Sequence, residues 1–114
     1  MWIEIFLKDC DIVGKIIYVD IDETICYYDE PLKDFNYALA KPNYKAIELV
    51  NEMYDSDNII IYWTARGTIS GIDWYDLTES QFKEWGVKYH DLRMGKPAYD
   101  LFICDKTKRM DELV

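Results

Sequence analysis

Apolar runs and short polar breaks alternate along this chain. Residues 15–21 (KIIYVDI) and 58–63 (NIIIYW) are continuous apolar runs rich in β-branched side chains, which is typical of strands buried on both faces. A third such run occupies residues 99–104 (YDLFIC), and residues 2–7 (WIEIFL) predict a shorter strand at a sheet edge. We therefore expect a small sheet built from these runs.

Helical periodicity occurs between the runs. Apolar side chains with the i, i+3, i+4, i+7 spacing of one helix face are Ala46, Ile47, Val50, Met53 and Tyr54. They predict a helix over residues 43–55, with Pro42 in its first turn. A second helix is expected over residues 73–85, where Gly86 can end it. Residues 24–40 lack a clean period and predict an irregular flap with a short hairpin.

The order strand, helix, strand, helix, strand predicts consecutive βαβ units and a parallel sheet with helices on both faces. The expected fold is thus a three-layer α/β/α sandwich, formed by a single domain over residues 1–114. Residues 87–90 are expected to contribute only a short extended piece. In such sheets ligands bind beyond the carboxyl ends of the strands. The residues at those ends are therefore the candidates for function.

Polar residues stand next to each apolar run, in the segments VDIDET, YWTAR and GKPAYDLFICD: Asp20, Asp22, Thr24, Thr64, Arg66, Lys96 and Asp105. Burying an unpaired carboxylate is costly, and several together repel one another. A divalent cation would remove that penalty, and carboxylate and carbonyl oxygens are the ligands that Mg²⁺ prefers. We therefore expect magnesium to bind Asp20, Asp105 and Asp22, the last through its carboxylate or its main-chain oxygen.

This arrangement resembles the haloacid dehalogenase (HAD) superfamily of phosphohydrolases. The four ordered motifs of that family are an apolar strand with DxDxT, a strand ending in Thr or Ser, a Lys, and a strand ending in acidic residues. Their matches here are, in that order, residues 20–24, Thr64, Lys96 and Asp105, and the match spans residues 15–106. The stretches TARGT, EWGVKYHDL and GKPAYDLFICDK are also similar to small capless members linked to capsule biosynthesis.

The resemblance implies a Rossmann-like hydrolase domain without a cap and a reaction through an aspartyl-phosphate. Asp20 would attack phosphorus, and Asp22 would protonate the leaving oxygen and later activate water. Thr64 would hydrogen-bond a phosphoryl oxygen, and Lys96 would neutralise charge on the nucleophile and the phosphoryl group. Magnesium would be the cofactor, held by Asp20, Asp22 and Asp105.

Arg66 and Thr24 are the candidate substrate-binding residues. Arg66 could equally pair with an acidic neighbour, and Thr24 could stabilise the turn after the first strand. For His90, the single histidine, a structural or substrate-side role is favoured over that of a general base, because Asp22 already supplies a base. Cys104 precedes Asp105 where many relatives carry a second acid, so weak magnesium binding is expected if that acid matters.

The composition of the chain excludes some classes of binding partner. The net charge of −9, from 22 acidic and 13 basic residues, argues against a nucleic-acid groove and against binding to anionic lipid. No apolar run approaches the ~20 residues of a membrane span. The three widely spaced cysteines fit neither a disulfide framework nor a zinc site, which favours a reduced, cytoplasmic setting. The sequence predicts no oligomeric state.

The leading hypothesis is a magnesium-dependent phosphomonoesterase acting on a small phosphorylated metabolite, such as a sugar phosphate or a nucleotide. A polynucleotide 3′-phosphatase fits the same motifs, although the net charge counts against it. A receiver-type phosphoacceptor domain also gathers Asp, Thr and Lys at strand ends, but DxDxT after an early strand favours the hydrolase. A degenerate hydrolase retained as a binding or regulatory module is the remaining alternative, and Cys104 makes it plausible.

Overall fold

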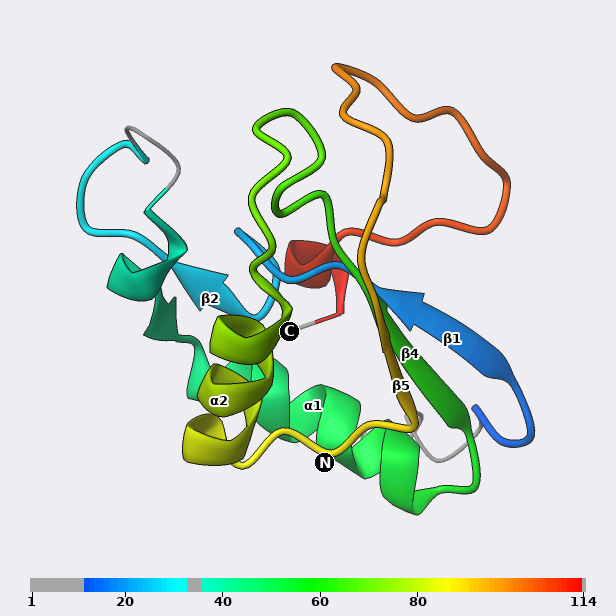
Figure 1. Ribbon diagram of the computed structural model, residues 1–114. Helices are drawn as coiled ribbons and strands as arrows, with labels where there is room; N and C mark the ends of the chain where they lie inside the picture. The colour runs from blue at the N-terminus through cyan, green and yellow to red at the C-terminus, as the bar shows by residue number, and fades with distance from the viewer. Residues whose placement is uncertain (1–11, 33–35, 114) are drawn as a thin grey trace.

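Three parallel strands form the centre of the computed structural model (Figure 1). They are β1 (Ile16–Val19), β4 (Ile59–Trp63) and β5 (Asp91–Arg93), and they lie side by side in the order β1-β4-β5. β1 and β4 coincide with the first two apolar runs, so the strands predicted over residues 15–21 and 58–63 are confirmed.

The structure describes residues 12–32 and 36–113 of the chain. The edge strand predicted over residues 2–7 lies outside the described residues. A short 3-10 turn, η3 (Met110–Glu112), stands near the end of the described chain. Among the residues that the structure describes, no helix is long and apolar enough to cross a bilayer.

Helices α1 (Tyr44–Asp55) and α2 (Tyr75–Trp85) connect the strands, as the periodicity predicted. The side chain of Asn43 caps the first turn of α1. Pro42 therefore precedes the cap, and the prediction that it lies in the first turn is wrong. Gly86 ends α2 in the left-handed region, with φ of 72°, which is the role expected of it.

Both helices cover the same face of the sheet (Figure 1). The strands follow one another across the sheet in chain order, so two right-handed crossovers pass over the same side. Buried residues of that face and of the helices form the core, among them Val19, Ile60, Tyr62, Val50 and Phe82. On the other face Ile16 is 69% exposed and Tyr18 50% exposed. The described residues thus form two layers, where helices on both faces were predicted.

The third strand differs from the prediction. It comprises Asp91–Arg93, whereas residues 99–104 form an exposed loop that projects away from the sheet (orange in Figure 1). Only residues 94–98 separate the two segments, and a parallel neighbour requires a crossover of about a dozen residues or more. The apolar run at 99–104 therefore stays outside the sheet, with Ile103 88% exposed.

A short antiparallel pair joins the two ends of the predicted flap, and its second strand begins just after the predicted bound at residue 40. Strand β2 (Cys26–Tyr27) pairs with β3 (Lys41–Pro42), and a 3-10 turn, η2 (Tyr37–Leu39), precedes β3. Gln81 of α2 donates a hydrogen bond of 2.8 Å from Nε2 to the main-chain oxygen of Tyr37. This bond holds the end of the flap against α2.

Candidate active site

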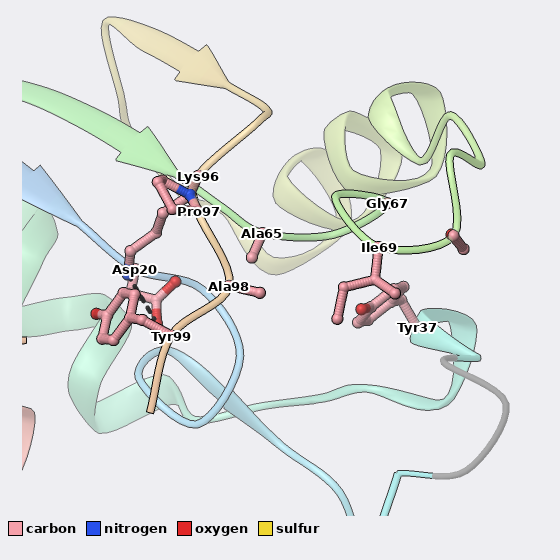
Figure 2. Close-up of a pocket in the computed structure, with 10 residues that line it drawn as sticks. Asp20, Tyr37, Ala65, Gly67, Ile69, Lys96, Pro97, Ala98 and Tyr99 are labelled. Carbon is pink, nitrogen blue, oxygen red and sulfur yellow. Dashed lines mark ion pairs between the residues drawn. The ribbon is translucent and has the colours of Figure 1, made fainter. Parts of the chain in front are cut away.

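A single pocket collects residues that follow all three strands of the sheet (Figure 2). Its volume is about 390 Å³. Asp20 follows β1, residues of the 65–70 loop follow β4, and residues 96–99 follow β5. Tyr37 of η2 also lines the pocket. The pocket therefore lies at the carboxyl ends of the parallel strands, where the sequence predicted the site.

Asp20 and Lys96 form an ion pair inside this pocket (dashed in Figure 2). Lys96 Nζ lies 3.5 Å from Asp20 Oδ2, and the side chains are 15% and 41% exposed, respectively. Burial raises the pKa of the Asp20 carboxyl above its ordinary value, while the charge of Lys96 acts in the opposite direction. The pair thus presents one partly desolvated carboxylate beside one cation.

Main-chain hydrogen bonds fix Lys96 beside the sheet. Thr64 N donates to Arg93 O, and Lys96 N donates to Thr64 O, both at 3.0 Å. Thr68 Oγ1 donates to Lys96 O at 2.7 Å. Lys96 therefore follows the third strand of the sheet, β5, although it precedes the apolar run at residues 99–104 that was predicted to form that strand.

Asp22 does not line the pocket, because its carboxylate pairs with Arg66. Arg66 donates from Nε to Asp22 Oδ2 at 3.0 Å and from Nη2 to Oδ1 at 2.9 Å. The Tyr28 hydroxyl donates to Asp22 Oδ1 at 2.6 Å. Arg66 is 2% exposed, and its Nη1 also donates to Thr78 and Gln81 of α2. Of the two roles left open for Arg66, the structure shows the pairing with an acidic neighbour.

Burial and the Asp22–Arg66 pair together shift the pKa values of the surrounding groups. Burial raises the pKa of Cys26 to about 12, and the charge of Asp22 adds to that effect. Burial and the hydrogen bond to Asp22 raise the pKa of Tyr28 as well. Burial by itself would lower the pKa of Arg66, but its bonds to Asp22 raise it above the ordinary value. Cys26 and Tyr28 are therefore protonated donors at neutral pH, and Arg66 is charged.

Thr64, directly after β4, and Thr24, in the turn after β1, both lie outside the pocket lining. Thr64 is 1% exposed, and its Oγ1 accepts a hydrogen bond of 3.1 Å from Arg66 N. Thr24 N donates to Ile21 O at 3.0 Å in the turn after β1. The phosphoryl-binding role of Thr64 and the substrate-binding role of Thr24 remain predictions, whereas the hydrogen bond between Thr64 and Arg66 and the position of Thr24 in a turn are observed.

The expected magnesium ligands are not brought together. Asp20 lines the pocket, the carboxylate of Asp22 is held by Arg66, and Asp105 lies in an exposed turn after the 99–104 loop. Over residues 12–32 and 36–113, no group of three or more His, Cys, Asp or Glu side chains is placed to hold a metal. As arranged here, these residues do not fit the predicted magnesium centre.

His90 has a structural role, as the sequence analysis allowed. Its Nδ1 accepts a hydrogen bond of 3.1 Å from Ile60 N, and its ring stacks on Tyr54 with centroids 4.5 Å apart. His90 N also donates to Ile60 O at 2.9 Å. These bonds attach the start of β5 to β4.

The apolar walls of the pocket were missed by the sequence analysis. Tyr37 packs edge-on against Trp74, with ring centroids 5.2 Å apart, and the Tyr99 ring centroid lies 5.3 Å from Lys96 Nζ. Ile69, in the loop after β4, is 72% exposed. The available signal was proximity in sequence, because Ile69 and Tyr99 lie within a few residues of the Thr64 and Lys96 motifs.

Gly67 is expected to be intolerant of any side chain. Its φ is +83°, and an added Cβ would lie 2.1 Å from the main-chain oxygen of Ile72. Gly71 is a matched control in the same loop, since its φ is +76° but nothing lies within 4 Å of an added Cβ. In urea unfolding we expect Gly67→Ala to cost about 2–3 kcal/mol and Gly71→Ala about 1 kcal/mol. Equal losses would contradict the close approach at Gly67.

Comparisons with known proteins give a structural relative but no family. No protein-family model matches the chain, and no curated protein matches it. The structure is similar to the crystal structure of an MCSG target from Vibrio cholerae, with a TM-score of 0.74 and 22% sequence identity over 86% of this chain and 85% of that one. Likeness at this identity concerns the fold alone. Residues 12–32 and 36–113 thus form a small α/β domain with a three-stranded parallel sheet and two α-helices, in an arrangement also found by crystallography.

Proposed function

We propose that this chain is a phosphomonoesterase of the haloacid dehalogenase type, with Asp20 as the nucleophile. The observation that carries the proposal is the Asp20–Lys96 pair, with 3.5 Å between Nζ and Oδ2. The pair lies beyond the carboxyl ends of a parallel sheet, in a pocket of about 390 Å³. The order of the DxDxT, Thr and Lys motifs along the chain supports the same function.

The chemistry follows from these two side chains. A carboxylate is an available nucleophile at neutral pH because it needs no further deprotonation. One oxygen of Asp20 bonds to phosphorus, and the bond between phosphorus and the alcohol oxygen breaks. Lys96 offsets the negative charge that gathers on the phosphoryl group in the transition state. Water then attacks phosphorus, which releases inorganic phosphate and restores Asp20.

The leaving alcohol also requires a proton. Asp22 is the donor that the resemblance implies, but its carboxylate accepts hydrogen bonds from Arg66 and Tyr28. Asp22 therefore has to leave this network before it can donate, and water in the pocket is the alternative donor. Magnesium dependence remains a prediction of the resemblance, and the steps above involve only the chain's own groups.

A phosphate-binding module without turnover is the second candidate. The engagement of Asp22 by Arg66 favours it, and so does the position of Asp105 in a turn away from the Asp20 pair. Such a module would bind a phosphate ester through Lys96 without breaking it. The two candidates differ in the fate of the phosphoryl group, so one experiment separates them.

That experiment measures phosphate release from a panel of phosphate monoesters, with magnesium and with a chelator. Portions quenched during turnover are digested and analysed by mass spectrometry. The phosphatase is expected to release many equivalents of phosphate, with an added HPO₃ group on the peptide that contains Asp20. Binding without release would support the module, and one equivalent of stable adduct would indicate a phosphoacceptor. Full activity in the chelator would contradict magnesium dependence.

A further inference from the structure

The pocket has two chemically different ends (Figure 2). Asp20 and Lys96 lie at one end with Tyr99, and Tyr37 and Ile69 lie at the other. The small residues Ala65 and Ala98 line the space between the ends (Figure 2). Apart from Asp20 and Lys96, every residue that lines the pocket is uncharged.

We propose that the pocket selects phosphate monoesters whose alcohol part is uncharged and carries a flat apolar face, the chemistry of a nucleoside 5′-monophosphate. The phosphate lies at the Asp20–Lys96 end, and the flat group lies against Ile69 and Tyr37. This inference rests on the proposed function, because it assumes that phosphate monoesters are the substrates. It concerns the Ile69 and Tyr37 end of the pocket, which does not take part in the reaction.

The charges favour a substrate with one phosphate. Lys96 is the single cation among the lining residues, and it already faces Asp20. The nearby guanidinium of Arg66 is committed to Asp22 and to α2. A second phosphate would therefore have no cation to oppose it, on a chain whose net charge is −9. Bisphosphates and polynucleotides are disfavoured for this reason.

The far wall favours an apolar group over a polyol. Ile69 is 72% exposed, so a flat ring placed against it would remove apolar surface from water. Tyr37 is a rigid partner, because it packs edge-on against Trp74 and its main-chain oxygen is bonded to Gln81. The hydroxyl groups of the wall are those of Ser70 and of Tyr37, which is a buried residue, and Ser70 Oγ already accepts a hydrogen bond from Ile72 N at 3.2 Å. The hydroxyl groups of a bare sugar would find few partners here.

The size of the pocket agrees with this class. A volume of about 390 Å³ exceeds what a phosphate group fills and falls within the range of small-molecule sites, roughly 300–1,000 Å³. Its lining places the ion pair and the apolar wall on opposite sides of one space (Figure 2). A ligand with a phosphate at one end and a ring at the other can contact both at once.

The test compares adenosine 5′-monophosphate with ribose 5-phosphate, which share a primary phosphate ester and differ in the base. We expect kcat/KM of the wild-type protein to be about tenfold higher for the nucleotide, the equivalent of ~1.4 kcal/mol. Ile69→Ser should bring the ratio close to one, mainly by raising KM for the nucleotide. Ile103→Ser, at a residue 88% exposed and outside the pocket lining, is the matched control and should keep the wild-type ratio.

Binding to the Asp20→Asn variant separates this inference from the proposed function. If calorimetry shows tighter binding of the nucleotide to that variant while the wild-type protein hydrolyses neither ester, the selection stands and the phosphatase is wrong. If both esters are hydrolysed with equal kcat/KM, the phosphatase stands and the selection is wrong. A ratio that Ile69→Ser leaves unchanged, or a failure of both esters to bind, overturns the selection as well.

Discussion

Replacing Asp20 by Asn is expected to reduce phosphate release by about 10⁴-fold or more, as the loss of a covalent nucleophile does in other enzymes. The amide keeps the shape of the side chain but cannot form the aspartyl-phosphate. The measurement is kcat at saturating substrate, with Asp100→Asn as the matched control. Asp100 is exposed and lies outside the pocket lining, so that variant should keep full activity. Turnover by Asp20→Asn within tenfold of the wild-type value would remove Asp20 from the reaction.

The stability of the same variant shows whether a loss of activity comes from chemistry or from unfolding. Burial raises the pKa of Asp20 above its ordinary value of 3.8, so the ionised carboxylate is less favourable in the folded chain than in the unfolded one. The wild-type protein therefore loses stability as the pH rises through the raised pKa, and Asn does not. Asp20→Asn should be slightly more stable at neutral pH, and the advantage should disappear below a pH of 3.8. The effect is small because the side chain is 41% exposed.

The largest loss of stability is expected from Asp22→Ala, at about 3–5 kcal/mol in the free energy of unfolding. The substitution leaves the Arg66 guanidinium, in a residue 2% exposed, without its carboxylate partner. Since the Asp22 side chain is itself 23% exposed, the loss should lie toward the lower end of that range. Urea unfolding at neutral pH measures it. Combining the change with Arg66→Met should recover part of the loss, because no unpaired charge then remains buried.

Asp91→Ala provides the control for this prediction. Asp91 also pairs with an arginine, Arg93, at 2.8 Å, but those side chains are 48% and 50% exposed. Water screens an ion pair between exposed side chains, so this variant should be close to the wild-type protein in stability. If Asp22→Ala were equally mild, Asp22 would not be committed to Arg66 in solution, and its assignment as the proton donor would gain support.

The strands at 15–21 and 58–63 and both helices could be predicted because their signals are local. β-branched runs and the 3.6-residue period reflect burial directly. The run at 99–104 carries the same signal, yet it stays outside the sheet because the link at residues 94–98 is too short for a parallel crossover. The length of the link at residues 94–98 can be read from the sequence, but the apolar pattern of residues 99–104 by itself does not show it.

The positions of site residues could be predicted where they depend on the ends of strands. They could not be predicted where they depend on the direction in which a side chain points. Asp20 follows β1 and Lys96 follows β5, and they meet because the carboxyl ends of all three parallel strands lie at one edge of the sheet. Asp22 stands two positions further on, after the chain has entered the turn in which Ile21 O accepts from Thr24 N and Ile25 N. Inside a turn the alternation of a strand no longer gives the direction of a side chain. The sequence therefore did not show that Asp22 pairs with Arg66, and the role of Arg66 stayed open between substrate binding and pairing with an acidic residue.

The two main-chain bonds of Thr64 extend the rungs between β4 and β5 beyond the last residue of β5, as far as the amide of Lys96. The backbone of this lysine is thus ordered as part of the sheet, and its conformational entropy is lost when the chain folds. A ligand that meets the ammonium group has only the side chain left to immobilise. The cation is in this sense preorganised, and its amide hydrogen should exchange with solvent only when the edge of the sheet opens.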